Sequence, residues 1–479
     1  MSKRVNRNGV VMCASAAMLL STTACAIGPK YMRPEMPNPP AYREAPPSGW
    51  TTAQPNDAAV RGLWWRTFSE PALDALEDQV SISNQNVLAA EAQYRAARAA
   101  VRVTAADQLP TVTATASATH AGGGAALHQG DLYQVPIDVS YDADVWGRIR
   151  HSVAANVAIA QASAADLESA RLLYQSELAS DYFQVQGLDA DRTLLEQAVG
   201  SYEEYLKLTQ DRFQGGVVSM ADVALAQTQL ESARAQLADI GIARAQFEHA
   251  IAVLTGHAPS DVSIPPTTAQ PSQPIVPVGL PSELLERRPD IAAAERRVAV
   301  ANQQIGVAKA AFYPDLSFGG SAGSQAVAIA ELFTAPTRLW SVGAQLAETL
   351  FDGGKRRAQV KVTEATYDTT VANYKETVLT GFQQVEDALS ALRILAQETE
   401  IVDRAVVAAQ QSLDISTTQY RGGLINYLQV ITAQTSLLQN QRDQVDLRTK
   451  QSLASVSLIQ ALGGGWSTSQ LPTTQEVRR

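Results

Sequence analysis

Two stretches of this chain read almost alike, "QGGVVSMADVALAQ" from Gln214 to Gln227 and "RGGLINYLQVITAQ" from Arg421 to Gln434. They begin 207 positions apart, since 421 − 214 = 207. In each, a Gly-Gly pair suited to a helix C-cap precedes the start of a new helix. Each stretch predicts a tight reversal between two helices. Their recurrence predicts two equivalent hairpins, one in each half of a tandem repeat.

Polar residues just after each glycine pair suit a helix start. Ser219 and Asp222 are three residues apart, as are Asn426 and Gln429. In a capping box the first side chain bonds the third helical N–H, and the third side chain returns the bond. One interpretation of Asp222 and Gln429 is therefore purely structural.

The segments between these motifs read as long helices. No proline occurs between Gly147 and Gly215, a span on the order of 100 Å if it is helical throughout. Apolar residues keep a three–four spacing, as at Phe382, Val385 and Leu389, which suits coiled-coil packing. Charged residues make up 18% of the chain and aromatic residues 6%, which favours alanine-lined helix contacts over a thick aromatic core.

Two pairs of strands are predicted from alternating apolar and polar residues. The first pair covers residues 111–120 and 132–146, and the second covers 315–324 and 339–350. After the N-terminal region no apolar run reaches the roughly 20 residues of a membrane helix. Strands that cross a membrane must form a closed barrel, whereas a pair of soluble hairpins is the alternative. On either interpretation, alternation places three acids on the water-facing side: Asp138, Asp142 and Asp144.

The N-terminus has the pattern of an export signal. A basic segment is followed by a short apolar run and by "STTAC", which ends at Cys25. The other cysteine, Cys13, lies inside the signal, so the mature chain has no intramolecular disulfide partner for Cys25. We predict a lipoprotein signal over residues 1–24, with diacylglycerol and an N-acyl chain on Cys25 as the only added groups. Ordinary cleavage near Ala24 is the alternative, because Thr22 stands where such signals usually carry Leu.

Charge and motif content argue against other classes of protein. The net charge is −10 and no basic run occurs beyond the first residues, so no nucleic-acid partner is expected. The five histidines show no metal-ligand spacing. No Gly-x-Ser-x-Gly motif occurs and no histidine has an evident catalytic partner. We therefore expect neither a metal site nor an enzyme.

The repeat and the proline distribution define the expected organisation. A Pro-rich stretch separates two repeats, and the C-terminal end reads as disordered. The predicted boundaries are an N-terminal tether at 25–60, a first repeat at 61–258, a linker at 259–283, a second repeat at 284–465 and a disordered tail at 466–479.

Five segments together resemble one known family. They are "CAIGPKYMRP" from Cys25, "WWRTFSEPALDAL" from Trp64, the stretch from Leu284 to Gly323, "LFDGGKRRAQ" from Leu350 and "YRGGLINYLQVITAQ" from Tyr420. In this order they resemble TolC-like outer membrane efflux proteins of the NodT branch. The resemblance implies a mostly α fold with a membrane β-barrel part. Each chain would supply long coiled-coil helices and four strands, and a homotrimer would form a 12-stranded barrel and an α-helical periplasmic tunnel.

The resemblance also implies a function and partners. The chain would be the exit duct of a tripartite efflux pump in the Gram-negative outer membrane, passively conducting substrates delivered by an inner-membrane resistance–nodulation–division pump. A periplasmic adaptor would meet the helix tips at Gly216, Val217, Gly423 and Leu424. The main alternative is a lipid-anchored periplasmic coiled-coil scaffold or adaptor without a pore.

The tips would also form a periplasmic gate. The resemblance assigns Asp222, Gln429 and Thr432 to it, although many relatives carry aspartates at the last two positions. We therefore expect the charge of the gate to come chiefly from Asp222, with Gln429 and Thr432 as neutral hydrogen-bonding members. Asp138, Asp142 and Asp144 would line the lumen.

Overall fold

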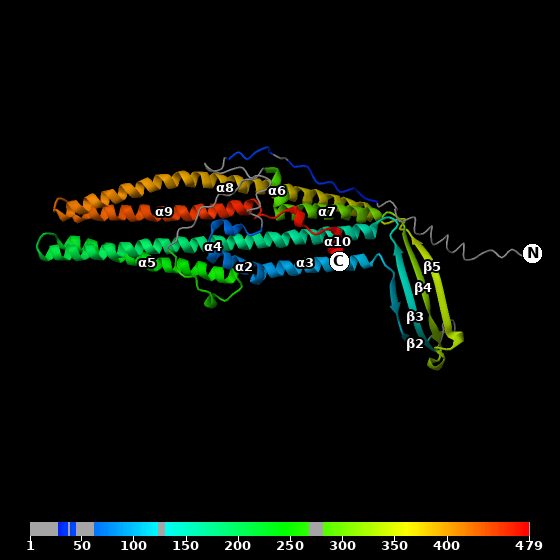
Figure 1. Ribbon diagram of the computed structural model, residues 1–479. Helices are drawn as coiled ribbons and strands as arrows, with labels where there is room; N and C mark the ends of the chain where they lie inside the picture. The colour runs from blue at the N-terminus through cyan, green and yellow to red at the C-terminus, as the bar shows by residue number, and fades with distance from the viewer. Residues whose placement is uncertain (1–26, 37–38, 45–61, 123–129, 268–280, 479) are drawn as a thin grey trace, which may run out of the picture.

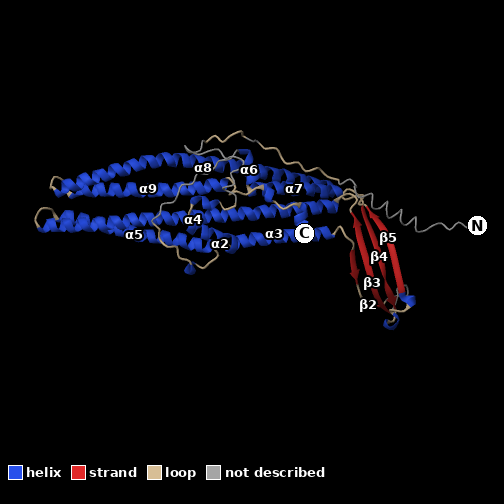
Figure 2. Cartoon of the chain, in the orientation of Figure 1, coloured by secondary structure: helices blue, strands red, loops and turns tan. Residues whose placement is uncertain are grey.

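Long helices lie side by side in a rod, and a β-sheet projects from one end of it (Figures 1 and 2). The opposite end of the rod consists of two helix reversals, α4 to α5 and α8 to α9. This arrangement is that of a computed structural model, which describes residues 27–36, 39–44, 62–122, 130–267 and 281–478. The signal, Cys25 and much of the predicted tether lie outside the described residues.

The two halves contain the same helices in the same order. Corresponding helices have equal lengths of 22, 67 and 35 residues. In the first half these are α3 (Gln85–Ala106), α4 (Arg148–Gln214) and α5 (Met220–Leu254). In the second half they are α7 (Pro289–Ala310), α8 (Lys355–Arg421) and α9 (Tyr427–Ala461). The tandem hairpins expected from the sequence are therefore present, and each long segment is one uninterrupted helix.

The helices form a single layer. Helices α7 and α9 lie end to end between α8 and α4, while α3 and α5 lie end to end along the other side of α4. Small residues bring the two halves close together. A Cβ atom added to Gly187 of α4 would lie only 2.3 Å from Oγ1 of Thr449 on α9. The contact between α4 and α9 is thus tighter than any larger side chain would allow.

The sheet is antiparallel and joins strands of both halves. Its order is β1-β3-β4-β5, and β2 also pairs with β3. The strands are β1 (Thr111–Ala114), β2 (Ser117–Ala121), β3 (Gly130–Ala143), β4 (Asp315–Ala326) and β5 (Arg338–Ala347). Short 3₁₀ turns at Ile329–Glu331 and Ala335–Thr337 join the last two.

The first predicted strand is divided in two. Thr115 donates its N–H to the carbonyl of Pro136 on β3 at 3.1 Å, but proline has no N–H with which to continue the ladder. The strands predicted to end at residues 146 and 350 end earlier, at Ala143 and Ala347. In both places the chain turns to begin a long helix.

A buried hydrophobic core lies at the middle of the rod. A 3₁₀ turn, η2 (Trp64–Phe68), and α2 (Pro71–Ser83) share one buried cluster with residues of α4, α8 and α9, and α2 packs directly against α4. The rings of Phe68 and Phe183 lie 4.7 Å apart. Aromatic residues are therefore concentrated here, and a second aromatic cluster lies near the tips around Tyr420 and Tyr427.

The linker and the tail differ from their predictions. The linker contains a 3₁₀ turn, η3 (Pro259–Asp261), and the start of α6 (Pro281–Arg287). The prediction of a disordered tail is wrong for residues 466–478, which include η6 (Thr468–Gln470) and α10 (Thr474–Arg478). Val477 is fully buried beside Val101 and Val153. The groove between α3 and α4 supplies the apolar contact that orders this tail.

Candidate functional site: the helix tips and the sheet

The two helix reversals share one backbone geometry. Gly216 and Gly423 adopt φ values of 72° and 76°, the left-handed region that favours glycine. The next residues, Val217 and Leu424, donate their N–H groups to the carbonyls of Arg212 and Gln419, each at 2.9 Å. This is the six-to-one bond of a Schellman cap.

The predicted tip residues lie together at the end of the rod (Figure 1). Val217 is 64% exposed and Leu424 is 78% exposed. Since the backbone of each turn is already hydrogen bonded, these apolar side chains are free to contact another protein.

Asp222 caps the start of α5, as one interpretation predicted. Its Oδ2 accepts from the N–H of Ser219 at 3.0 Å and from Oγ of Ser219 at 2.9 Å. The N–H of Asp222 donates to Oγ of Ser219 at 3.4 Å, which completes a capping box. Its carboxylate is partly exposed.

The second capping box is absent, so that prediction is wrong. The side chain of Asn426 accepts no cap bond, and the N–H of Gln429 reaches only the backbone oxygen of Asn426, at 3.4 Å. Burial of Tyr427 holds the start of α9 instead. Thr432 donates Oγ1 to the carbonyl of Leu428 at 2.9 Å. Within the described chain no hydrogen bond joins Asp222 to Gln429 or Thr432.

A contact that the sequence did not predict joins the two tips. Arg212 of α4 donates Nη1 to the carbonyl of Tyr420 on α8 at 2.7 Å. Its guanidinium lies 4.6 Å from the centre of the Tyr420 ring, within cation–π range. Nearby, the hydroxyl of Tyr205 lies 2.7 Å from Oγ1 of Thr417. The only sequence signal is an asymmetry, because Gln419 stands where the repeat would place a second Arg212.

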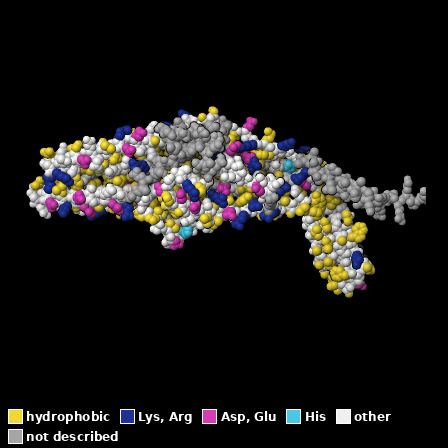
Figure 3. Space-filling model, viewed as in Figure 1, with side chains coloured by type: hydrophobic (Ala, Val, Ile, Leu, Met, Phe, Trp, Pro, Cys, Tyr) yellow, Lys and Arg dark blue, Asp and Glu magenta, His cyan; other side chains and the backbone are white. Residues whose placement is uncertain are grey.

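The sheet has one polar and one apolar face. In register across three strands, Asp138 lies opposite Ser321 and Ser321 lies opposite Ser341. Asp142 shares this face. The other face carries exposed apolar side chains: Val112, Ile137, Val139, Trp340, Val342 and Leu346. Figure 3 shows hydrophobic side chains gathered over the sheet, while charges are spread along the helices.

Asp144 does not belong to the polar face. It lies beyond the end of β3 and caps α4, accepting the N–H groups of Ile149 at 3.0 Å and Arg150 at 2.8 Å. Its side chain also forms an ion pair with Arg150 at 3.1 Å. The prediction that Asp144 lines the wall with Asp138 and Asp142 is therefore wrong, because alternation does not continue through the turn.

The start of α8 uses the same arrangement. Asp352 accepts the N–H groups of Gly354 at 2.9 Å and Arg356 at 3.1 Å, and the Arg356 side chain lies 2.7 Å away. The Arg356 side-chain bond and these backbone bonds lower the pKa of Asp352 to about 2.

The first described residues are held where the helices meet the sheet. Ile27 donates its N–H to the carbonyl of Trp146 at 3.1 Å. Gly28 packs so closely against Gly306 and the ring of His151 that a Cβ at Gly28 would lie 2.9 Å from Cα of Gly306. Asn302 donates to the carbonyl of the next residue, Pro29, at 3.1 Å. The segment that follows Cys25 is therefore anchored at this junction.

Within the ranges that the structure describes, two kinds of feature are absent. No described helix has both the length and the apolar character needed to cross a bilayer. No group of three or more His, Cys, Asp or Glu in the described ranges is arranged to hold a metal ion.

Comparison with known proteins decides the family. The family model "Outer membrane efflux protein" matches residues 76–257 and 280–464, one match in each half. The chain belongs to this family. OprJ, an outer membrane protein of Pseudomonas aeruginosa, is 32% identical over 464 residues, covering 94% of this chain and 95% of OprJ.

A second relative and a solved structure agree. TtgC of Pseudomonas putida, named a probable efflux pump outer membrane protein, is 31% identical over 451 residues, covering 92% of this chain and 93% of TtgC. The structure of the outer-membrane channel OprN superposes with a TM-score of 0.86 at 28% identity, covering 92% of this chain and 100% of that one. The fold is thus that of TolC-like efflux channels, and this chain is an outer membrane efflux component.

Proposed function

We propose that three copies of this chain assemble into a passive exit duct. The observation that carries the proposal is the sheet, whose two outer edges, β1/β2 and β5, have no strand partner in the described chain. Unpaired edges are not tolerated in lipid. Counting β1 and β2 as one interrupted strand, three copies would close a 12-stranded barrel. The apolar face would meet lipid, and Asp138 and Asp142 would line the lumen.

The two outer edges of the helical layer also carry exposed apolar side chains, as expected if copies of the chain pack side by side in a ring. Exposed apolar residues follow α8, and others follow α3 and α5 at the opposite edge of the layer. On α8 they include Leu379, Ile394 and Ile401, and on α3 and α5 they include Leu88, Leu225 and Ile242. Packing α8 of one copy against α3 and α5 of the next would bury both sets and close a tunnel.

At the tips we propose a docking site for a periplasmic adaptor. The exposed side chains of Val217 and Leu424, presented by the caps at Gly216 and Gly423, support this role. The adaptor would connect the duct to an inner-membrane resistance–nodulation–division pump, which supplies the energy. We assign no catalytic step to the duct.

The tips would also close the duct. Asp222 would contribute the charge of the gate, with Gln429 and Thr432 as neutral members. Three copies of Asp222 around a narrow mouth would favour cations over anions. The Arg212–Tyr420 contact would hold the two hairpins of one chain together in the closed state.

The N-terminus would anchor the chain through acyl groups on Cys25. Ile27, two residues further on, is bonded at the junction of helices and sheet. Acyl chains on Cys25 would therefore enter the bilayer beside the strands. Two or more such chains give stable anchoring.

Native mass spectrometry of protein extracted from outer membranes in mild detergent tests the assembly. We expect three copies, each lacking the signal and carrying acyl mass on Cys25. A monomer without acyl mass would contradict both the duct and the anchor.

Recordings in planar bilayers test the gate. Asp222→Asn removes the charge but keeps an oxygen for the cap, so we expect weaker cation preference. Asp239→Asn, an exposed position on the same helix, is the matched control. If Asp222→Asn and the control conduct alike with unchanged ion preference, Asp222 is a helix cap and nothing more.

A further inference from the structure

The helical layer has one covered face and one bare face. On α8, the carboxylate of Glu386 accepts the N–H groups of Arg43 at 2.8 Å and Glu44 at 2.9 Å, and Arg393 pairs with Glu44 at 2.7 Å. The N-terminal segment therefore runs along this side. About 100° separates successive residues of an α-helix, so Ala388 and Ala391 lie on the opposite side of α8.

Helix α7 likewise has one side that contacts the N-terminal segment and an opposite side that does not. Asn302 contacts the N-terminal segment at Pro29, and Glu295 contacts it at Tyr31. Asp290 lies about 120–140° around the helix from these two residues. The proposed acyl anchor on Cys25 would lie in lipid outside the duct, so the face along which the N-terminal segment runs would be the outer face and the opposite face would line the lumen.

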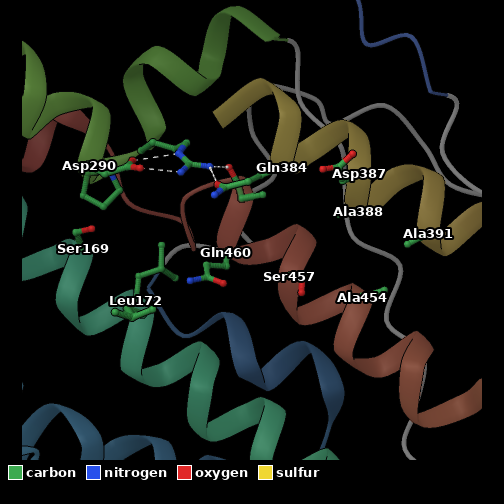
Figure 4. A pocket seen from close by; sticks show the side chains of 14 residues that line it. Ser169, Leu172, Asp290, Gln384, Asp387, Ala388, Ala391, Ala454, Ser457 and Gln460 are labelled. Carbon is green, nitrogen blue, oxygen red and sulfur yellow. Dashed lines mark hydrogen bonds and ion pairs between the residues drawn. The ribbon is translucent and has the colours of Figure 1, made fainter. Parts of the chain in front are cut away.

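A cavity of about 550 Å³ opens on this second face, between α4, α7, α8 and α9 (Figure 4). It lies where α9 ends and α7 begins. Arg288 spans the junction, donating to the carbonyl of Ala461 at 2.9 Å and to Oε1 of Gln384 at 2.8 Å. The size is that of a pocket for a drug-sized molecule.

The charges around the cavity leave a net negative site. Arg288 is buried and forms a two-point ion pair with Asp290 at 3.0 and 2.7 Å, so these two charges cancel. Asp387 is exposed at the rim and accepts only from the side-chain amide of Gln383, at 3.3 Å. No lysine or arginine in the described ranges pairs with Asp387. One uncompensated carboxylate therefore faces the cavity mouth.

The rest of the lining is apolar with a few free polar groups. Leu172 and Leu173 of α4 form one wall, and alanines of α8 and α9 form the other. The side chains of Ser457 and Gln460 of α9 lie at the cavity (Figure 4). Neither side chain forms a hydrogen bond within the described chain. Such a lining suits a ligand with an apolar body and a few polar atoms.

We infer that this cavity is a binding site for organic cations with an apolar body, which pause here on their way through the duct. The inference rests on the proposed function, because only a channel brings such molecules to this face. Asp387 attracts the positive charge, Leu172 and Leu173 contact the apolar body, and Ser457 and Gln460 bond its polar atoms. A trimer would hold three such sites around the lumen.

Binding of ethidium, a rigid aromatic cation, to the purified full-length protein in detergent tests the site. Fluorescence anisotropy should show saturable binding. Asp387→Asn keeps the shape and removes the charge, and should weaken binding about fivefold, as loss of roughly 1 kcal/mol predicts. Asp368→Asn is the matched control, since it makes the same change at an exposed position of α8 away from the cavity. It should bind as the unmodified protein does.

Filling the cavity provides a second test. Ser457→Trp, or Ala391→Met should the first variant misfold, should lower ethidium affinity at least tenfold. Equal affinity of Asp387→Asn and Asp368→Asn, or unchanged binding by the filled variants, overturns the inference. A trimer that conducts in bilayers without this binding overturns the site alone. A chain that forms neither trimer nor pore contradicts the proposed function instead.

Discussion

Replacing one glycine should separate the effect of close helix packing from that of helix propensity. Gly187 of α4 faces Thr449 of α9, and an added Cβ would lie 2.3 Å from Oγ1 and 3.2 Å from Cγ2. Oγ1 of Thr449 also donates to the carbonyl of Val445 at 3.0 Å, so rotating Oγ1 away from Gly187 breaks this bond in a buried contact. Gly187→Ala must therefore either push α4 and α9 apart or force that rotation.

Two opposing effects set the magnitude. Alanine in a helix interior is more favourable than glycine by about 1 kcal/mol. Forcing an extra carbon into a packed contact costs about 1–3 kcal/mol. Gly200→Ala on the same helix is the control, because a Cβ there meets no atom within 4 Å. We expect Gly200→Ala to stabilise the protein, and Gly187→Ala to be less stable than this control by about 1–3 kcal/mol.

Thermal unfolding followed by far-ultraviolet circular dichroism measures the difference. Adding Thr449→Ala to Gly187→Ala removes both clashing atoms and should recover most of the lost stability. If Gly187→Ala is as stable as Gly200→Ala, or if Thr449→Ala brings no recovery, the tight contact between the two halves is refuted.

Three further substitutions test individual side chains. Arg212→Gln removes a charge-assisted bond worth roughly 1.5–3 kcal/mol and should raise the conductance of the pore in bilayer recordings. Arg234→Gln removes an ion pair with Glu203 that joins α5 to α4 within the first half, and this change should leave the conductance unaltered. Burial, with smaller contributions from Asp78 and Asp74, raises the pKa of Glu77 well above its ordinary value. The folded state then stays protonated at pH values where the unfolded chain ionises, so stability should fall as pH rises above about 4.5 toward the folded pKa. Glu77→Gln should flatten this loss in unfolding measurements across that pH range. Val477→Asp places an unpaired carboxylate in an apolar groove and should expose the C-terminal segment to proteolysis, whereas the exposed Ser469→Asp should not.

Some features of the site were predictable because they depend on local backbone chemistry. Two successive glycines before a helix-start motif specify a Schellman reversal, and both tips formed as expected. The capping box of Ser219 and Asp222 has the same local origin. The second box failed because Tyr427 packs into an aromatic cluster, which no three-residue spacing could reveal.

The polar face of the sheet shows the same limit. Alternation correctly places Asp138 and Asp142 together, because successive side chains of a strand point to opposite faces. It fails at Asp144, where the strand has ended and the carboxylate caps α4. A strand's period indicates which face a residue takes but not the residue at which pairing stops.

The sequence by itself determined the tandem repeat, the long helices and the strands, since each follows from periodic apolar residues and from glycine or proline at the breaks. Only the tertiary structure decided which residues of the two halves meet. Arg212 donates a hydrogen bond to Tyr420, Gly187 packs against Thr449, and Val477 lies in a groove between α3 and α4. These partners are far apart in the chain, and their contact depends on how whole helices align. Patterns among neighbouring residues in the sequence do not specify how these helices align.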